Sequence, residues 1–153
     1  MSNEANASRP LIGRESTAVP GHFGEPLSVE YSVTSRGGFD QHPTHPLFLC
    51  LHGWGSSEED MAGIMRLIAP YNDFVALRGP LALAKAPERS EMPGNYAWLH
   101  DALPVGDDLD YDAYAAATAV DRWVAANIPA DRDVVPLGFS QGGLVAVHLL
   151  RIN

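Results

Sequence analysis

The hydrophobic positions of the chain form short runs whose spacing is typical of β-strands. Residues 27–33 alternate apolar and polar side chains, which is the pattern of a half-exposed edge strand. Residues 47–51, 74–77 and 134–138 are apolar at nearly every position instead. We interpret these three runs as strands covered on both faces, because a strand with two buried faces has no polar side to present.

Helix-like segments lie between and after these runs. Ser56 and Glu59 have the spacing of a capping box, which predicts a helix from there to about Ala69. Apolar residues recur at helical spacing over residues 111–127, and a third, strongly apolar helix is expected from about Gln141. Strands that alternate with helices predict a mostly parallel sheet with helices packed on it, an α/β fold.

The remaining segments divide the chain. Residues 1–26 are rich in Pro, Gly and polar side chains, and we expect an irregular N-terminal lead-in there. Residues 78–110 also carry many Pro and Gly positions and are expected to form a long excursion from the sheet. Residues 27–153 are then expected to form one domain, because the 153-residue chain has about the length of a single domain.

Charge and composition exclude several classes of partner. The net charge of −9 argues against nucleic acid and anionic lipid, which both require a positive protein face. No apolar stretch reaches the about 18 residues of a membrane span, and the N-terminus lacks a signal-peptide pattern. We therefore expect a cytoplasmic protein.

The residues that could hold a metal are too few or wrongly spaced. The one cysteine, Cys50, excludes an internal disulfide and any Cys-rich zinc site. His42 and His45 form a pair without an obvious third ligand. The acidic stretch 101–121 lacks the spacing of an EF-hand loop and is expected to be solvated surface. We therefore expect no metal and no cofactor.

A serine between glycines follows the last apolar strand. Gly138, Phe139, Ser140, Gln141 and Gly142 match the G-x-S-x-G nucleophile elbow, a sharp turn from strand to helix. The turn needs neighbours without a Cβ, and it exposes the serine hydroxyl at a helix N-terminus, where backbone N–H groups favour negative charge. The alternative interpretation is an ordinary helix N-cap at Ser140.

A second motif, HGWG at residues 52–55, directly follows the strand 47–51. Acyl-transfer sites need a backbone N–H from a second loop to complete an oxyanion hole, and Gly53 and Gly55 would let this loop approach the reacting carbonyl. The donors are expected to be the N–H groups of Trp54 and Gln141. We interpret His52 as a structural residue of the loop rather than as the general base.

Four blocks in the order LHGWGSSEEDM, ALRGPLAL, NYAWL and PLGFSQGGLVA resemble the phospholipase/carboxylesterase family of small α/β-hydrolases, which includes acyl-protein thioesterases. The resemblance implies a three-layer α/β-hydrolase fold and hydrolysis of carboxylic esters or thioesters through an acyl-serine intermediate. It further implies that Ser140 is the nucleophile, that the Trp54 and Gln141 amides hold the oxyanion, and that Trp98 lines the acyl pocket.

The chain departs from this family after the elbow. In α/β-hydrolases an acid and then a histidine follow the serine, whereas the only such residue after Ser140 is His148. Eight residues along a helix place His148 about 12 Å from the serine, too far for a hydrogen bond. The fold is thus expected to be truncated after the elbow helix, with the acid and the base outside this chain.

Two functions remain open from the sequence. The first is a serine hydrolase whose partner molecule is a small acyl ester or thioester. The second is a non-catalytic fragment or pseudoenzyme that binds acyl ligands or a partner chain. In either case the strand 134–138 is expected to become an apolar sheet edge, which a second copy or another chain would cover.

Overall fold

A four-stranded sheet forms the centre of the computed structural model, which describes residues 27–84, 94–103 and 105–152. Its order is β1–β3–β2–β6. Strand β2 is parallel to β3 and to β6, whereas β1 is antiparallel to β3. The strands are β1 (Ser32–Thr34), β2 (Leu47–Leu51), β3 (Phe74–Leu77) and β6 (Val134–Gly138). The predicted mostly parallel sheet is confirmed.

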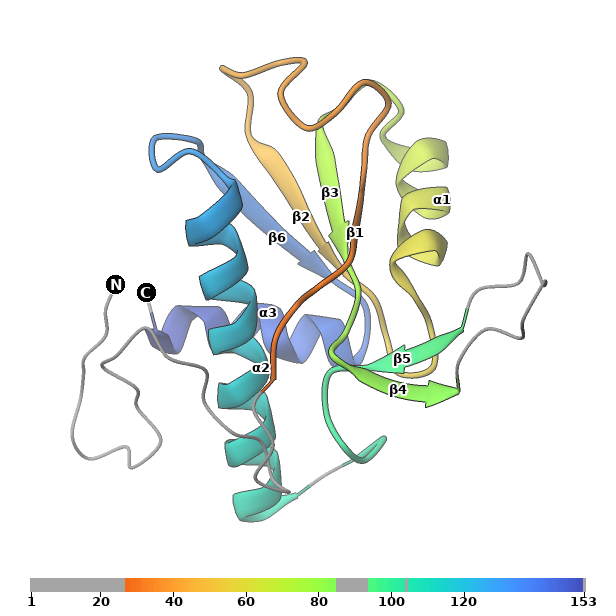
Figure 1. The fold of residues 1–153 in the computed structure, drawn as a ribbon, viewed down its shortest axis with the longest axis vertical. Helices are drawn as coiled ribbons and strands as arrows, with labels where there is room; N and C mark the ends of the chain where they lie inside the picture. Colours follow the sequence, from red (N-terminus) through yellow and green to blue (C-terminus); the bar gives the residue numbers. More distant parts are fainter. Residues whose placement is uncertain (1–26, 85–93, 104, 153) are drawn as a thin grey trace.

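Helices cover both faces of this sheet (Figure 1). Helix α1 (Glu58–Ile68) packs on one face, and α2 (Gly106–Asn127) and α3 (Gln141–Ile152) pack on the other. Successive side chains of β2 point to opposite faces. Leu47, Leu49 and Leu51 therefore join the core with α2 and α3, while Cys50 joins the core with α1. This alternation produces the expected three layers.

The helix boundaries differ from the prediction. Helix α1 is capped by Ser57, whose side chain accepts a hydrogen bond from the Asp60 N–H, and not by Ser56. Ser56 instead donates to the Asp60 carboxylate at 2.9 Å. Helix α2 begins at Gly106 and not near residue 111, after the N-cap residue Val105, which makes no side-chain cap. Valine has no side-chain oxygen that could accept a hydrogen bond from the first N–H groups of the helix, so no capping motif marked this start in the sequence.

Strand β6 is more exposed than predicted. We expected both of its faces to be buried, but Val135 is 41% exposed, and Phe139 at its end is 44% exposed. Among the described strands, β6 lies at the edge of the sheet and has β2 as its one neighbour. The expectation of an apolar edge at 134–138 is therefore confirmed, whereas the expectation of a covered strand is wrong.

The segment after β3 contains structure that the sequence pattern did not reveal. Strands β4 (Leu81–Ala84) and β5 (Asn95–Ala97) form a two-stranded antiparallel sheet within the expected excursion. The predicted edge strand over 27–33 is also wrong in its bounds, because only Ser32–Thr34 pair with β3. The lead-in expected over 1–26 lies outside the described residues. In the part of the chain that the structure describes, no helix combines the length and apolarity that a membrane crossing requires.

Candidate active site at the strand–helix turn

Ser140 lies in the tight turn that joins β6 to α3. Its φ angle is 52°, and it is the only residue other than glycine with a positive φ in the described ranges. A non-glycine residue in this region is strained by contact between its Cβ and the backbone. The side chain is exposed, and its hydroxyl makes no hydrogen bond to any described residue. The turn therefore holds a strained serine open to solvent, as a nucleophile elbow requires.

The glycines on either side of Ser140 are sterically required. A Cβ added to Gly138 would lie 2.3 Å from the Gly142 carbonyl oxygen. A Cβ added to Gly142 would lie 2.1 Å from the Leu51 carbonyl oxygen. Both distances are far inside van der Waals contact, and in both cases the obstacle is backbone that cannot rotate away. Helix α3 can therefore start against the end of β2 only where these two residues lack side chains.

The loop after β2 lies directly beside the turn. A Cβ built on Gly53 would lie 3.4 Å from the Ser140 Cβ and 3.3 Å from the Phe139 carbonyl oxygen. Gly55 has a φ of 78°, which lets the loop turn back towards β5. Among the described residues, neither the Trp54 nor the Gln141 backbone N–H donates a hydrogen bond. Two unused donors thus flank Ser140 on the loop and on the helix.

His52 is a buried support of this loop. It is 0% exposed, and its Nε2 accepts a hydrogen bond of 2.9 Å from the Gly79 N–H. Nδ1 must then carry the proton and donates to the Gly53 carbonyl at 2.8 Å. Burial lowers the pKa of His52, with smaller opposing effects of the Gly53 carbonyl and nearby carboxylates. Because both ring nitrogens already have backbone partners, His52 has no nitrogen left to accept a proton from Ser140.

The Gln141 side chain connects the turn to the segment after β5. Its Oε1 accepts hydrogen bonds from the Trp98 N–H at 2.9 Å and the Leu99 N–H at 3.1 Å. Its Nε2 donates to the Asp101 carbonyl at 3.0 Å. Trp98 is 0% exposed, and its indole N–H donates to the His52 carbonyl at 2.9 Å. In this conformation Trp98 supports the loop, and contact with an acyl group would require its ring to become accessible.

A second, charged support was not predicted from the sequence. The Arg78 guanidinium donates to both carboxylate oxygens of Glu58, the shortest contact being 2.6 Å. Its carbon lies 4.1 Å from the centre of the Tyr31 ring and 4.3 Å from that of Tyr96. Glu58 raises the pKa of Arg78. Glu58 is the first residue of α1, so this ion pair fixes the far end of the loop that contains Trp54.

Tyr96 holds the same loop through its backbone. The Gly55 N–H donates to the Tyr96 carbonyl, and the Tyr96 N–H donates to the Ser56 carbonyl, both at 2.9 Å. Arg78 lies at the start of the excursion expected over residues 78–110, where the sequence pattern shows no partner for it. Its partners Glu58 and Tyr96 are about 20 residues distant on either side, and only the folded chain brings them together.

The described histidines do not reach the serine. His148 lies on α3, where its Nδ1 is 3.1 Å from the Arg151 Nη1. Burial lowers the pKa of His148, and the positive charge of Arg151 lowers it further. His100 is paired through Nδ1 with the carboxylate of Asp112 at 2.9 Å. Asp112 is 0% exposed, so at this position the expectation of a solvated acidic surface is wrong. Within the described residues, no imidazole is hydrogen-bonded to Ser140.

Comparison with known proteins adds to this geometry. Among solved structures, the chain is similar to the crystal structure of Zea mays acyl-protein thioesterase 2, with a TM-score of 0.53 and 19% sequence identity. The similarity covers 77% of this chain and 49% of that chain, so this chain spans about half the length of the maize structure, and at this identity it shows a shared fold. The search of curated proteins gives no match. The family model described as phospholipase/carboxylesterase matches residues 39–152. Since this match covers most of the sequence, the chain belongs to the phospholipase/carboxylesterase family.

Proposed function

We propose that this chain carries the nucleophile and oxyanion hole of a serine hydrolase that cleaves carboxylic esters or thioesters. The observation that carries the proposal is the strained, exposed Ser140 beside two unused backbone donors. Ser140 Oγ attacks the carbonyl carbon and gives its proton to a general base, which returns it to the leaving alcohol or thiol; the N–H groups of Trp54 and Gln141 stabilise the resulting oxyanion. The carbonyl reforms, the alcohol or thiol leaves, and water then releases the acid from the acyl-serine.

The base and acid of the reaction are proposed to come from polypeptide outside this chain. Both ring nitrogens of His52 are hydrogen-bonded to backbone groups, and His148 is the eighth residue after Ser140, about 12 Å away along the helix axis. An oxyanion hole without its general base still leaves roughly 10³- to 10⁴-fold acceleration over water in other hydrolases. We therefore expect weak but measurable hydrolysis by the 153-residue chain.

Hydrolysis of p-nitrophenyl acetate by the wild type and by Ser140→Ala tests this function. We expect the substitution to remove the turnover above background and to abolish labelling by a fluorophosphonate. Ser28→Ala is the matched control, because Ser28 is an exposed serine away from the turn. Equal turnover by the wild type and Ser140→Ala would contradict the proposed mechanism.

The second candidate function is binding without turnover, of an acyl ligand or a partner chain. It is favoured by the apolar surface that β6 and α3 leave open, where Val135, Phe139, Val147 and Leu150 are all at least 41% exposed. Exposed apolar side chains that gather in one patch mark interaction sites in other proteins. Light scattering after size exclusion tests a homo-oligomer, and a monomer would contradict it. The cytoplasmic location stays a prediction from the sequence.

A further inference from the structure

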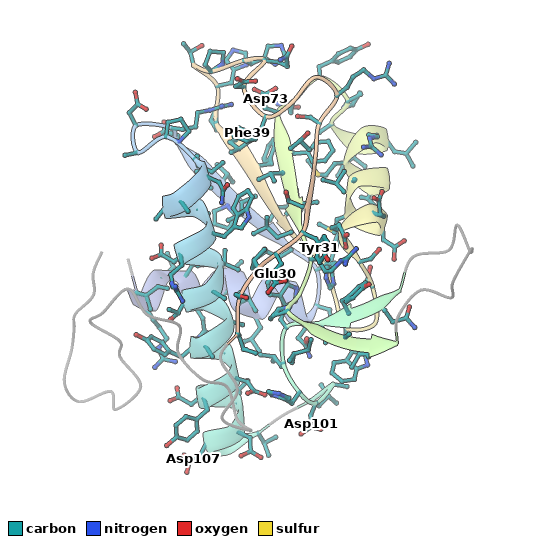
Figure 2. All side chains as sticks on the ribbon, viewed as in Figure 1. Glu30, Tyr31, Phe39, Asp73, Asp101 and Asp107 are labelled. Atoms are coloured by element: carbon teal, nitrogen blue, oxygen red, sulfur yellow. The ribbon has the colours of Figure 1, made fainter. Side chains whose placement is uncertain are left out.

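A pocket lies at the opposite end of the sheet from Ser140. It has a volume of about 580 Å³ and is formed by the loop after β1, the turn after α1 and the residues that enter β3. These segments lie together at the top of Figure 1, near Asp73 in Figure 2, whereas β2 and β6 run away from them towards the turn at Ser140. The pocket is therefore separate from the candidate active site.

The lining of this pocket is positively charged. Arg36 and Arg66 both line it, and neither side chain makes a hydrogen bond or ion pair with any described residue. The one acidic lining residue, Asp73, is buried and already neutralised. Its carboxylate accepts hydrogen bonds from the His42 N–H at 2.7 Å and from the Arg132 Nη2 at 3.0 Å. Two guanidinium groups thus remain uncompensated, on a chain whose net charge is −9.

The loop that carries Arg36 is held in a fixed conformation. The Ser35 hydroxyl donates to the Gly38 carbonyl at 2.9 Å and accepts from the Phe74 N–H at 3.0 Å. The Arg132 guanidinium also donates to three carbonyls of the same loop, those of Phe39, His42 and His45, at 2.8–3.1 Å. A loop fixed in this way loses little conformational freedom when a ligand binds.

Apolar surface completes the lining. Pro70, Tyr71 and Phe74 contribute to it, and Tyr71 is 86% exposed. Arginine pairs with planar carboxylate and with phosphate oxygens through its fork of N–H groups, and an exposed aromatic ring contributes contact area to an apolar ligand. The volume falls within the range of small-molecule sites, about 300–1,000 Å³.

We propose that this pocket binds a small organic anion, with its carboxylate or phosphate group on Arg36 and Arg66 and its apolar part against Tyr71. Benzoate carries a carboxylate and phenyl phosphate carries a phosphate, each on a phenyl ring, and benzamide is the neutral analogue of benzoate. Isothermal titration at low ionic strength, with the whole chain, compares the three compounds. Binding of either anion, with weaker binding of benzamide, is the expected result, and the preferred anion identifies the headgroup.

Charge-removing variants test the location. Arg36→Gln and Arg66→Gln are each expected to weaken anion binding about tenfold, because each removes a charge-assisted hydrogen bond. Arg122→Gln is the matched control, since it removes the same charge from α2, outside the pocket lining. Circular dichroism checks that each variant is folded.

Three results would overturn the proposal: no binding of either anion, equal binding of benzamide, or an equal loss in Arg122→Gln. Ser140→Ala separates this site from the proposed active site. Anion binding should be unchanged in that variant, and a loss of binding there would show that the anion occupies the elbow instead.

Discussion

Replacing Gly142 by Ala tests the packing on which the candidate active site depends. The added Cβ would lie 2.1 Å from the Leu51 carbonyl oxygen and 2.5 Å from that of His52. Real Cβ atoms essentially never approach other atoms closer than 3.0 Å, so the start of α3 and the end of β2 must move apart by about 0.9 Å. The obstacle is backbone of a strand and of the loop beside Ser140, which cannot adopt another rotamer.

The cost of this movement is expected to be large. Overpacking of a well-packed core typically costs about 1–3 kcal/mol, and a rigid backbone obstacle places this case near about 3 kcal/mol. Gly63→Ala is the matched control, because Gly63 lies inside α1 and an added Cβ would meet nothing within 4 Å. There the same chemical change should stabilise the protein by about 1 kcal/mol, the difference in helix propensity.

Urea unfolding followed by circular dichroism measures both variants. With a slope of about 2 kcal/mol per molar urea, Gly142→Ala should lower the midpoint by about 1.5 M, and Gly63→Ala should raise it by about 0.5 M. If Gly142→Ala unfolds at the same urea concentration as the wild type, α3 does not start against β2 as described, and the case for an elbow at Ser140 fails with it.

Three further predictions concern strain, burial and charge. Ser140→Gly should be more stable than Ser140→Ala by about 1 kcal/mol in urea unfolding, because only glycine adopts a φ of 52° without strain. Equal stability of the two variants would show that the backbone at residue 140 is not strained. Replacing Arg78 by Met leaves the buried Glu58 carboxylate without its partner and should lower the free energy of unfolding by about 3 kcal/mol. Replacing both Arg78 and Glu58 by Met should recover most of this loss, because no unpaired charge then remains buried. Burial raises the pKa of the Asp73 carboxyl, but hydrogen bonds from its neighbours outweigh this and lower the pKa below 3.8. The wild type should therefore exceed Asp73→Asn in free energy of unfolding by a constant amount at pH values above the unfolded-state pKa of Asp73. This difference should shrink as the pH falls through the folded-state pKa, and a difference independent of pH would contradict the prediction.

Local sequence patterns predicted the three central strands and the tight turn at the candidate site. The apolar runs predicted β2, β3 and β6 at the bounds that the structure has. For β2 and β3 the physical reason is burial, because a strand between neighbours and under helices must be apolar at nearly every position. The glycines around Ser140 predicted the tight turn for a similar reason, since a backbone that approaches another backbone closely excludes a Cβ. Both features are encoded within a few consecutive residues.

Only the tertiary structure decided the features that depend on distant residues. The pairing of Glu58 with Arg78, the bonds of the Gln141 side chain and the burial of Trp98 all join segments that are about 20 to 46 residues apart. The exposure of β6 likewise follows from its place at the sheet edge and not from its own apolar sequence. The periodicity of a segment indicates which of its faces is buried. Which element buries that face, and whether any described strand does so, depends on how the whole chain packs.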